Sequence, residues 1–284
     1  MDMIIERAPE LSDETLAESG FYWREAGHVK LLICRPLEEA GFVNAFSTRL
    51  GGVSPLPEND LNLSGFGEDS DENIHENRRR FLSAFDGDYS LATVWQVHGD
   101  GIKIARTPQD AANTEEKFDA VASDLPHILA GVKTADCVPI LIGDPETRAF
   151  AAVHAGWRGT VRSIAAQTIK TMAAEFGSDP ASLICAIGPA ASCRSYEIGP
   201  DVVEEFEKHF STSGKYFTAT YDGHALIDLH LANRDQLAAW GVLEKNIFTA
   251  PFCTILRTDL FFSYRIEKKK YGKTGRLMSV IGRR

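Results

Sequence analysis

The chain has 284 residues, of which 44% are hydrophobic and 25% are charged, a composition typical of globular proteins. Its formal net charge of -10 at pH 7 argues against binding to nucleic acid or to an anionic membrane surface. No stretch approaches the roughly 20 apolar residues of a membrane span, and the first 20 residues lack the apolar core of a signal peptide.

The five cysteines are scattered along the chain and include no CxxC pair. An odd number without a regular spacing does not indicate a disulfide framework, and it fits a reducing compartment. We therefore expect a cytoplasmic protein whose partners are small molecules, with neither nucleic acid nor a membrane among them. The oligomeric state is left open.

The predicted elements begin with an N-terminal lead-in over residues 1–28, in which Ser12 or Asp13 caps a short helix ending near Gly20. Apolar strands follow in the segments HVKLLICRPL and FVNAFSTR. The segment LGGVSPLPENDLNLSGFGEDSDEN is rich in turn-forming residues and predicts a long loop, a feature that is often functional. DENIHENRRRFLSAF then restores helical spacing.

From residue 91 the pattern is typical of short strands bounded by Gly, Asp or Pro, in the segments LATVWQVHG, GIKIAR, DAVASD, HILAGVKT, CVPILIGD and AFAAVHAG. An amphipathic helix follows over residues 161–176 and ends at Gly177. We then predict a strand in ASLICAIGP, helices in PDVVEEFEKHF and NRDQLAAWG, and closing strands in FFSYR and RLMSVIG.

The central run of strands without intervening helices favours an α+β fold with a mixed sheet over a doubly wound parallel sheet. No internal repeat, linker or change of composition divides the chain. We therefore predict a single catalytic domain over residues 29–284, preceded by the lead-in.

Three segments combine residues that carry chemistry: VWQVHGD, VKTADCVPILIGD and AAVHAGWRGT. His98 ends an apolar strand, Cys137 begins one, and His154 ends another, just before small residues that allow a second group to approach closely. One cysteine and two histidines suit zinc, which accepts thiolate and imidazole and leaves a fourth position for water or substrate. The three residues match no local zinc motif, so a Cys–His nucleophile pair and three unrelated residues stay open as alternatives.

Asp136 lies beside Cys137 at the start of an apolar strand, where a carboxylate needs a partner. It is a candidate catalytic residue, either as an acid–base group or as a group that orients a metal ligand. Arg49 ends the segment FSTR and is a candidate to hold a phosphate or carboxylate bidentately, with Ser47 beside it. Asn62 is a candidate to bind a hydroxyl group. A surface arginine and a turn-forming asparagine are the alternatives.

Taken together, the segments FSTRLGGVS, DLNL, ENRRRF, WQVHG, DAVASD, TADCVPILIGDP, VHAGWRGT, IGPAASCRSYEIG and FFSYR resemble the family first labelled multicopper polyphenol oxidase (laccase-like). The same family is also described as purine nucleoside phosphorylase and adenosine deaminase, and some bacterial members are called peptidoglycan editing factor. The resemblance extends in order from about residue 42 to 282.

The resemblance implies a zinc site on the residues that stand here as His98, Cys137 and His154, with copper as an alternative ion. It also implies a sandwich-like single domain with flanking helices, similar to the cysteine deamidase fold of cytotoxic necrotising toxins. A nucleoside pocket would lie near the metal, with Arg49 close by. Two positions depart from the family pattern: Asn44 replaces a usual His, and Asp60 replaces a frequent Ser. We expect Asp60 to add negative charge beside the pocket.

Four functional hypotheses follow. The first is a zinc-dependent enzyme that splits adenosine, inosine, guanosine or methylthioadenosine with phosphate and also deaminates adenosine, with Arg49 and the helix start after His154 holding the phosphate. The second is a Cys–His hydrolase or amidase, with Cys137 as nucleophile, that edits peptidoglycan precursors. The third is a copper-dependent polyphenol oxidase, which usually needs more histidine ligands than this site offers. The fourth is a non-catalytic partner in cell-wall quality control.

Overall fold

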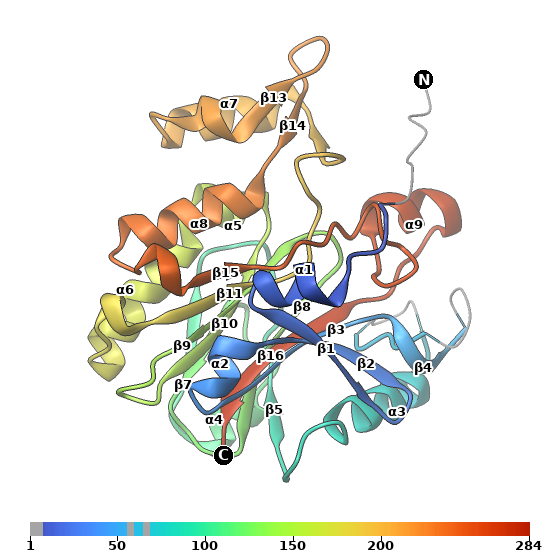
Figure 1. Ribbon diagram of the computed structural model, residues 1–284, viewed down its shortest axis with the longest axis vertical. Coiled ribbons are helices and arrows are strands. Elements are labelled where there is room, and N and C mark those ends of the chain that lie inside the picture. Colours follow the sequence, from blue (N-terminus) through green and yellow to red (C-terminus); the bar gives the residue numbers. More distant parts are fainter. Residues whose placement is uncertain (1–7, 56–59, 65–68) are drawn as a thin grey trace.

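Two six-stranded sheets pack against each other in the computed structural model (Figure 1), which describes residues 8–55, 60–64 and 69–284. In spatial order the first sheet contains β1 (Phe21–Ala26), β2 (Val29–Cys34), β3 (Phe42–Ser47), β16 (Leu277–Arg283), β8 (Ile128–Thr134) and β5 (Ser90–Ala92). The second contains β15 (Ile247–Thr249), β11 (Ile184–Ile187), β9 (Val138–Gly143), β10 (Phe150–Ala155), β7 (Ala120–Ser123) and β6 (Ile102–Ala105). A small third sheet contains β12 (Glu197–Ile198), β14 (Ala225–Ile227) and β13 (Phe217–Ala219), while β4 spans Leu50–Ser54.

Both large sheets are mixed, because most neighbours are antiparallel while β5 runs parallel to β8 and β6 runs parallel to β7. The apolar core between the sheets takes side chains from both, such as Phe46 and Val132 from the first and Leu141 and Phe150 from the second. A strand that is covered on both faces has a nearly continuous run of apolar residues in its sequence. The strand β9, with six buried residues, is an example.

Helices cover the outer faces of both sheets. The helices are α1 (Asp13–Glu18), α2 (Arg35–Glu39), α3 (Asp71–Leu82), α4 (Pro108–Ala112), α5 (Trp157–Val161), α6 (Ile164–Phe176), α7 (Pro200–His209), α8 (Leu229–Ala239) and α9 (Tyr264–Tyr271), with short 3₁₀ turns at Pro180–Ser182, Ser213–Tyr216 and Glu244–Asn246. In Figure 1, α5, α6 and α8 lie together beside the second sheet, α3 lies beside the first, and α7 projects at the top with β13 and β14. The predicted α+β fold, a mixed-sheet sandwich with flanking helices, is confirmed. The likeness to the toxin deamidases stays a prediction.

Local sequence signals explain where α3 begins and ends. Ser70 caps α3 by accepting a hydrogen bond from the backbone N–H of Asn73 at 3.2 Å. Acidic residues occupy the first turn, and Arg79 and Arg80 lie in the last, as the helix dipole favours. Phe81 packs in a cluster with side chains of the first sheet. Asn77 bonds to β4 and to the segment 60–62, and Arg78 donates to the carbonyl of Leu63.

Five sequence predictions differ from the structure. The segment LGGVSPLPENDLNLSGFGEDSDEN, expected to be a loop, begins with β4. Residues 21–26, placed in the lead-in, form β1 and pair along their whole length with β2; the division of the chain at residue 28 otherwise stays a prediction. The segment FFSYR is not a strand, because the Ser263 hydroxyl caps α9 by accepting from the N–H of Ile266. The helix expected over 161–176 is two helices, since Ser163 has a φ of 61°. LATVWQVHG contributes only the short strand β5. In the described part of the chain no helix is long and apolar enough to cross a membrane.

Candidate metal centre and active site

The structure brings His98, from the loop between β5 and β6, to Cys137 and His154 at the ends of two paired strands. Cys137 immediately precedes β9, whose Pro139 lies opposite His154 in the antiparallel register with β10. The ligand atoms of the three residues all lie within 4.8 Å of one another, and the two imidazole rings are 4.9 Å apart between centroids at an interplanar angle of 77°. Residues separated by 39 and 17 positions (98 to 137 and 137 to 154) therefore form one group that could hold a metal ion.

Asp119 organises two sides of this group. Its Oδ1 accepts a hydrogen bond at 2.9 Å from the backbone N–H of His98, and its Oδ2 accepts from Val97 at 3.2 Å and from Gly99 at 2.6 Å. The same Oδ1 lies 2.8 Å from Nδ1 of His154. With Nδ1 engaged, the Nε2 atom of His154 is left for a ligand, which is the usual arrangement of a metal-binding histidine and its carboxylate partner.

The Asp119 contacts also explain why LATVWQVHG does not continue as a strand. Three successive N–H groups converge on one carboxylate, and His98 takes a φ of 58°, which non-glycine residues rarely adopt. Our reading of the sequence missed Asp119 as a site residue. Asp119, like Asp136, directly precedes a buried strand, where a carboxylate needs partners, and this feature of the sequence could have identified it.

Gly156 gives the three ligands room. A Cβ atom at this position would lie 3.1 Å from Sγ of Cys137 and 3.1 Å from Cδ2 of His98. Both contacts are tighter than ordinary van der Waals distances. The small residue after His154 therefore allows the thiol and the second imidazole to approach.

The electrostatics of the group favour a thiolate. Burial acts to raise the pKa of the Cys137 thiol, but the charges and hydrogen bonds of His154 and His98 outweigh it and lower that pKa to about 6. Burial acts to lower the pKa of His154, while Cys137 and Asp119 raise it to about 9. A thiolate and two imidazoles form a donor set that fits zinc.

The group lies in the wall of a cavity of about 610 Å³. Among the residues that the structure describes, its lining includes four aromatic and five cationic side chains, with Glu115 and Asp136 as the two carboxylates. The aromatic and cationic residues are Trp95, Trp157, Tyr196, Tyr264, Arg78, Lys133, Arg158, Arg265 and Arg276. A cavity of this size with aromatic walls suits a purine nucleoside, because the purine rings can stack on aromatic faces. The cations favour a partner that carries negative charge.

Asp136 also lines the cavity, but three donors hold its carboxylate. It accepts hydrogen bonds from Thr254 Oγ1 at 2.7 Å, from Ser263 Oγ at 3.0 Å and from the backbone N–H of Arg265 at 2.7 Å. Its φ of 83° turns the chain sharply just before Cys137. These contacts join Asp136, the residue beside Cys137, to the segment after β15 and to the start of α9. An orienting role for it stays a prediction, as does an acid–base role.

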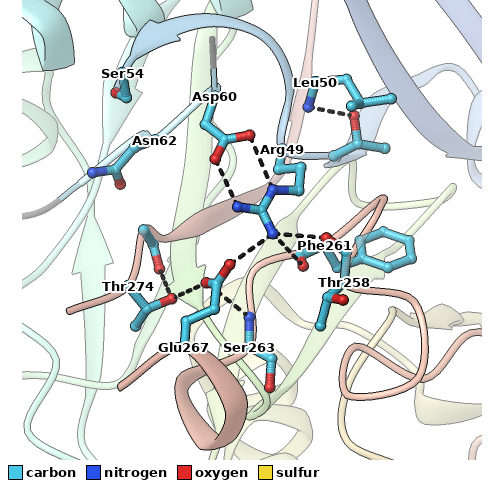
Figure 2. A network of polar contacts seen from close by, with 12 residues as sticks. Arg49, Leu50, Ser54, Asp60, Asn62, Thr258, Phe261, Ser263, Glu267 and Thr274 are labelled. Atoms are coloured by element: carbon cyan, nitrogen blue, oxygen red, sulfur yellow. Dashed lines mark hydrogen bonds and ion pairs between the residues drawn. The ribbon is translucent and has the colours of Figure 1, made fainter. Parts of the chain in front are cut away.

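Arg49 lies outside the cavity lining and is surrounded by carboxylates (Figure 2). Its Nε and Nη2 donate to the two oxygens of Asp60 at 3.0 and 2.6 Å, and its Nη1 donates to Glu267 at 2.7 Å. The side chain of Arg49 is about 5% exposed, so its charge is neutralised inside the protein. The role of Arg49 in holding a phosphate stays a prediction from the sequence.

The other predicted substrate-binding residues also lie outside the cavity lining. The Ser47 hydroxyl accepts from the N–H of Met278 at 3.0 Å, and Asn62 Oδ1 accepts from the N–H of Arg276 at 2.8 Å. Asn44 exchanges two hydrogen bonds with the backbone of Cys34. The expectation that Asp60 adds charge beside the pocket is wrong, because its carboxylate pairs with Arg49.

Replacing Asp119 by asparagine is expected to weaken the affinity for a divalent metal by about 10- to 100-fold, since partners of ligating histidines contribute that much. The amide cannot match the four contacts that the carboxylate makes with His154 and the loop. The measurement is competition for zinc against a chelator of known affinity. Asp124→Asn, just beyond the other end of β7, is the matched control and should leave the affinity unchanged. Equal affinities in both variants would contradict the assigned role.

Comparison with known proteins places the chain among a set of related sequences and structures. It is 33% identical over 255 residues to "Purine nucleoside phosphorylase YfiH" of Escherichia coli, covering 89% of this chain and 98% of that protein. It is 35% identical over 241 residues to "Purine nucleoside phosphorylase" of Deinococcus radiodurans, covering 84% and 88%. The crystal structure of YlmD from Geobacillus stearothermophilus matches with a TM-score of 0.83 at 31% identity, covering 92% and 98%.

A hypothetical protein YfiH of Bacillus licheniformis has a similar crystal structure, with a TM-score of 0.84 and 29% identity over 92% of this chain and 99% of that one. The model of one protein family, described as multi-copper polyphenol oxidoreductase laccase, matches residues 43–284. The matched region contains both large sheets except β1 and β2, together with His98, Cys137 and His154. The chain therefore belongs to the multi-copper polyphenol oxidoreductase laccase family.

Proposed function

We propose that this chain is a zinc-dependent purine nucleoside phosphorylase that also deaminates adenosine. The observation that carries the proposal is the group His98, Cys137 and His154 in the wall of a 610 Å³ cavity lined by aromatic and cationic side chains. The names of relatives 33–35% identical over most of their lengths support the phosphorylase part of the proposal. Adenosine, inosine, guanosine and methylthioadenosine are the candidate substrates.

Zinc would be held by the Sγ atom of Cys137 and by imidazole nitrogens of His98 and His154, with Asp119 fixing the His154 ring. When bound, zinc supplies a Lewis-acidic centre with a position left open for substrate or water. Copper is the alternative ion, because it binds most nitrogen and sulfur sites more tightly than zinc does.

In phosphorolysis a phosphate oxygen forms a bond with C1′ of the ribose while the C1′–N9 bond breaks. The electron pair of the broken bond leaves with the purine, which takes up a proton, and the sugar becomes ribose 1-phosphate. The chain contributes aromatic faces for the purine, from Trp95, Trp157 and Tyr264, and cations that hold the phosphate beside the sugar. Deamination replaces the amino group at C6 of adenine with the oxygen of water and releases ammonia.

The test is to incubate the purified, zinc-loaded protein with each nucleoside, with and without phosphate, and to separate the products chromatographically. We expect free purine and ribose 1-phosphate only when phosphate is present, and inosine with ammonia from adenosine in its absence. Nucleosides left untouched under both conditions would refute the proposal. Inosine without any phosphorolysis would retain only the deaminase part.

A second candidate is a Cys–His hydrolase or amidase acting on peptidoglycan precursors. The contact between Cys137 and His154 favours it, because a thiol hydrogen-bonded to a buried imidazole is also the arrangement of a cysteine nucleophile and its base. Full activity in the presence of a chelator, together with inactivation by a thiol reagent, would select this candidate.

Copper-dependent polyphenol oxidation is the third candidate and rests on the family description alone. Within residues 8–55, 60–64 and 69–284, His98, Cys137 and His154 form the single group of three or more potential ligands. Oxidases that use several coppers need several such groups. Oxygen consumption with a phenol by the copper-loaded protein, set against the zinc-loaded protein, measures this activity.

A further inference from the structure

Three cationic side chains that the sequence analysis did not single out share one part of the cavity: Arg78, Lys133 and Arg276. They come from three separate elements. Arg78 is on α3, Lys133 is on β8, and Arg276 immediately precedes β16. Each is half-buried, so their charges face the cavity from the protein interior.

The backbone of residues 62–63 holds the two arginines next to each other. The Nε of Arg78 donates to the carbonyl of Leu63 at 3.0 Å, and the N–H of Leu63 donates to the carbonyl of Arg276 at 3.0 Å. The N–H of Arg276 donates in turn to Oδ1 of Asn62 at 2.8 Å. Asn62, predicted to touch substrate, therefore acts through Arg276.

Lys133 is fixed beside them by its backbone and its side chain. The side-chain amide of Gln96 bonds to the backbone of Lys133: its Oε1 accepts from the Lys133 N–H at 2.8 Å, and its Nε2 donates to the Lys133 carbonyl at 2.7 Å. The Lys133 Nζ donates to the carbonyl of Val94 at 2.9 Å. Because Met278 lies opposite Lys133 in the pairing of β16 with β8, Arg276 enters the sheet two residues away from it.

The charges of Arg78 and Lys133 are not compensated by ion pairs among the residues that the structure describes, where no carboxylate lies within 4.0 Å of either. Burial, together with repulsion from Arg78 and Arg276, lowers the pKa of Lys133 to about 8, against an opposing effect of Glu115. Arg49 is the opposite case, since two carboxylates surround it. Like charges held together in a concave site attract an anion.

We propose that Arg78, Lys133 and Arg276 form the phosphate subsite of the cavity. The identity of the anion as the co-substrate rests on the proposed phosphorolysis. Arginine guanidinium groups suit the oxygens of phosphate because they can donate two hydrogen bonds side by side, and Lys133 adds a point charge. In this proposal these three residues, and not Arg49 as the sequence predicted, hold the phosphate.

The test is calorimetric titration of the zinc-loaded, full-length protein with inorganic phosphate. Arg78→Gln and Lys133→Met are each expected to raise the dissociation constant by about 10- to 100-fold, because hydrogen bonds to charged groups contribute about that much. Arg79→Gln is the matched control. It neutralises the next residue of α3, which is exposed and pairs with Glu76 outside the cavity, and it should leave the constant unchanged. Zinc content and thermal melting of each variant show that it is folded.

Two sources of the phosphate group are separated by adding inosine 5′-monophosphate as a second titrant. In a phosphorolysis assay of the two variants, a rise in the KM for phosphate with the KM for inosine unchanged assigns the subsite to inorganic phosphate. Loss of nucleotide binding alone assigns it to a 5′-phosphate. If wild-type protein binds phosphate but catalyses no phosphorolysis, the subsite stands and the proposed function fails. Unchanged binding of both titrants in both variants, or no saturable binding to the wild type, overturns the subsite.

Lys133 also predicts the pH dependence of phosphate use. Because its pKa is about 8, the ammonium group loses its proton as the pH rises through 8, and phosphate affinity should fall above that pH. The charged groups that face it are Arg78, Arg276 and Glu115. Lys133→Arg retains the cation, so its kcat/KM for phosphate should stay level between about pH 7.5 and 9.5, where the wild type declines. Parallel profiles for the two proteins would contradict this role of Lys133.

Discussion

Replacing Cys137 by serine is expected to remove the metal and to lower phosphorolysis by more than about 100-fold, since changing even the partner of a ligand costs about 10- to 100-fold. The thiol supplies the one anionic ligand of the group, and its neighbours His154 and His98 stabilise the thiolate form. A serine hydroxyl in the same place is neutral near pH 7 and is a poor zinc ligand. Elemental analysis and a phosphorolysis assay on the same preparations measure both effects.

The matched control is Cys193→Ser, at a half-buried cysteine that does not line the cavity. It should keep about one zinc per chain and full activity. Normal zinc content in Cys137→Ser would refute the proposed ligand set. If both the wild type and Cys137→Ser contain no metal and only the wild type is active, Cys137 would instead be the nucleophile of a hydrolase. The next measurement would then be activity in the presence of a chelator.

Replacing Arg49 by methionine is expected to lower the free energy of unfolding by about 3–5 kcal/mol, the usual effect of removing one partner from a buried ionic network. Asp60 and Glu267 would be left inside the protein without their common cation, and their side chains are about 5% and 3% exposed. The carbonyls of Thr258 and Phe261 would also lose a donor. Denaturation by urea, followed by circular dichroism, measures the loss.

The same variant tests what Arg49 does for substrate. Because its guanidinium does not line the cavity, the folded variant should keep the wild-type KM for phosphate. The triple variant Arg49→Met, Asp60→Asn and Glu267→Gln should recover much of the stability, since no buried charge is then left unpaired. Arg79→Gln, at an exposed arginine, should unfold like the wild type. A raised KM for phosphate at unchanged stability would restore the substrate-binding role predicted from the sequence.

Arg49 and Arg78 show how the same residue type serves two purposes in one protein. Arg49 lies in the turn between β3 and β4, and Arg78 lies on α3. Arg49 pairs with two buried carboxylates and joins this turn to α9, so its charge is neutralised within the fold. Arg78 meets a backbone carbonyl and the cavity, so its charge is available to an anion.

The sequence alone was sufficient for the layered α+β fold and for the group His98, Cys137 and His154. Strand periodicity and turn residues identified most of the strands in both large sheets, because burial on two faces produces nearly continuous apolar runs. The donor types, two imidazoles and one thiol, suit zinc, and the resemblance to the family selected the same three residues from the alternatives that their spacing left open. Zinc itself stays a proposal.

Asp119 and the cationic subsite depended on tertiary structure. Asp119 lies 35 residues from His154, and only the pairing of β7 with β10 shows that their side chains meet. Arg78, Lys133 and Arg276 come from three elements with no shared motif.

The contacts of Arg49 also depended on tertiary structure. Its partner Glu267 is 218 residues away, in α9. Only the first two residues of this helix, Tyr264 and Arg265, fall in the segment FFSYR that was expected to be a strand. A sequence shows which side chains carry charge. Whether that charge is neutralised within the protein or offered to a ligand depends on which distant residues pack beside it, because electrostatic interactions act over a few ångströms in space and take no account of separation along the chain.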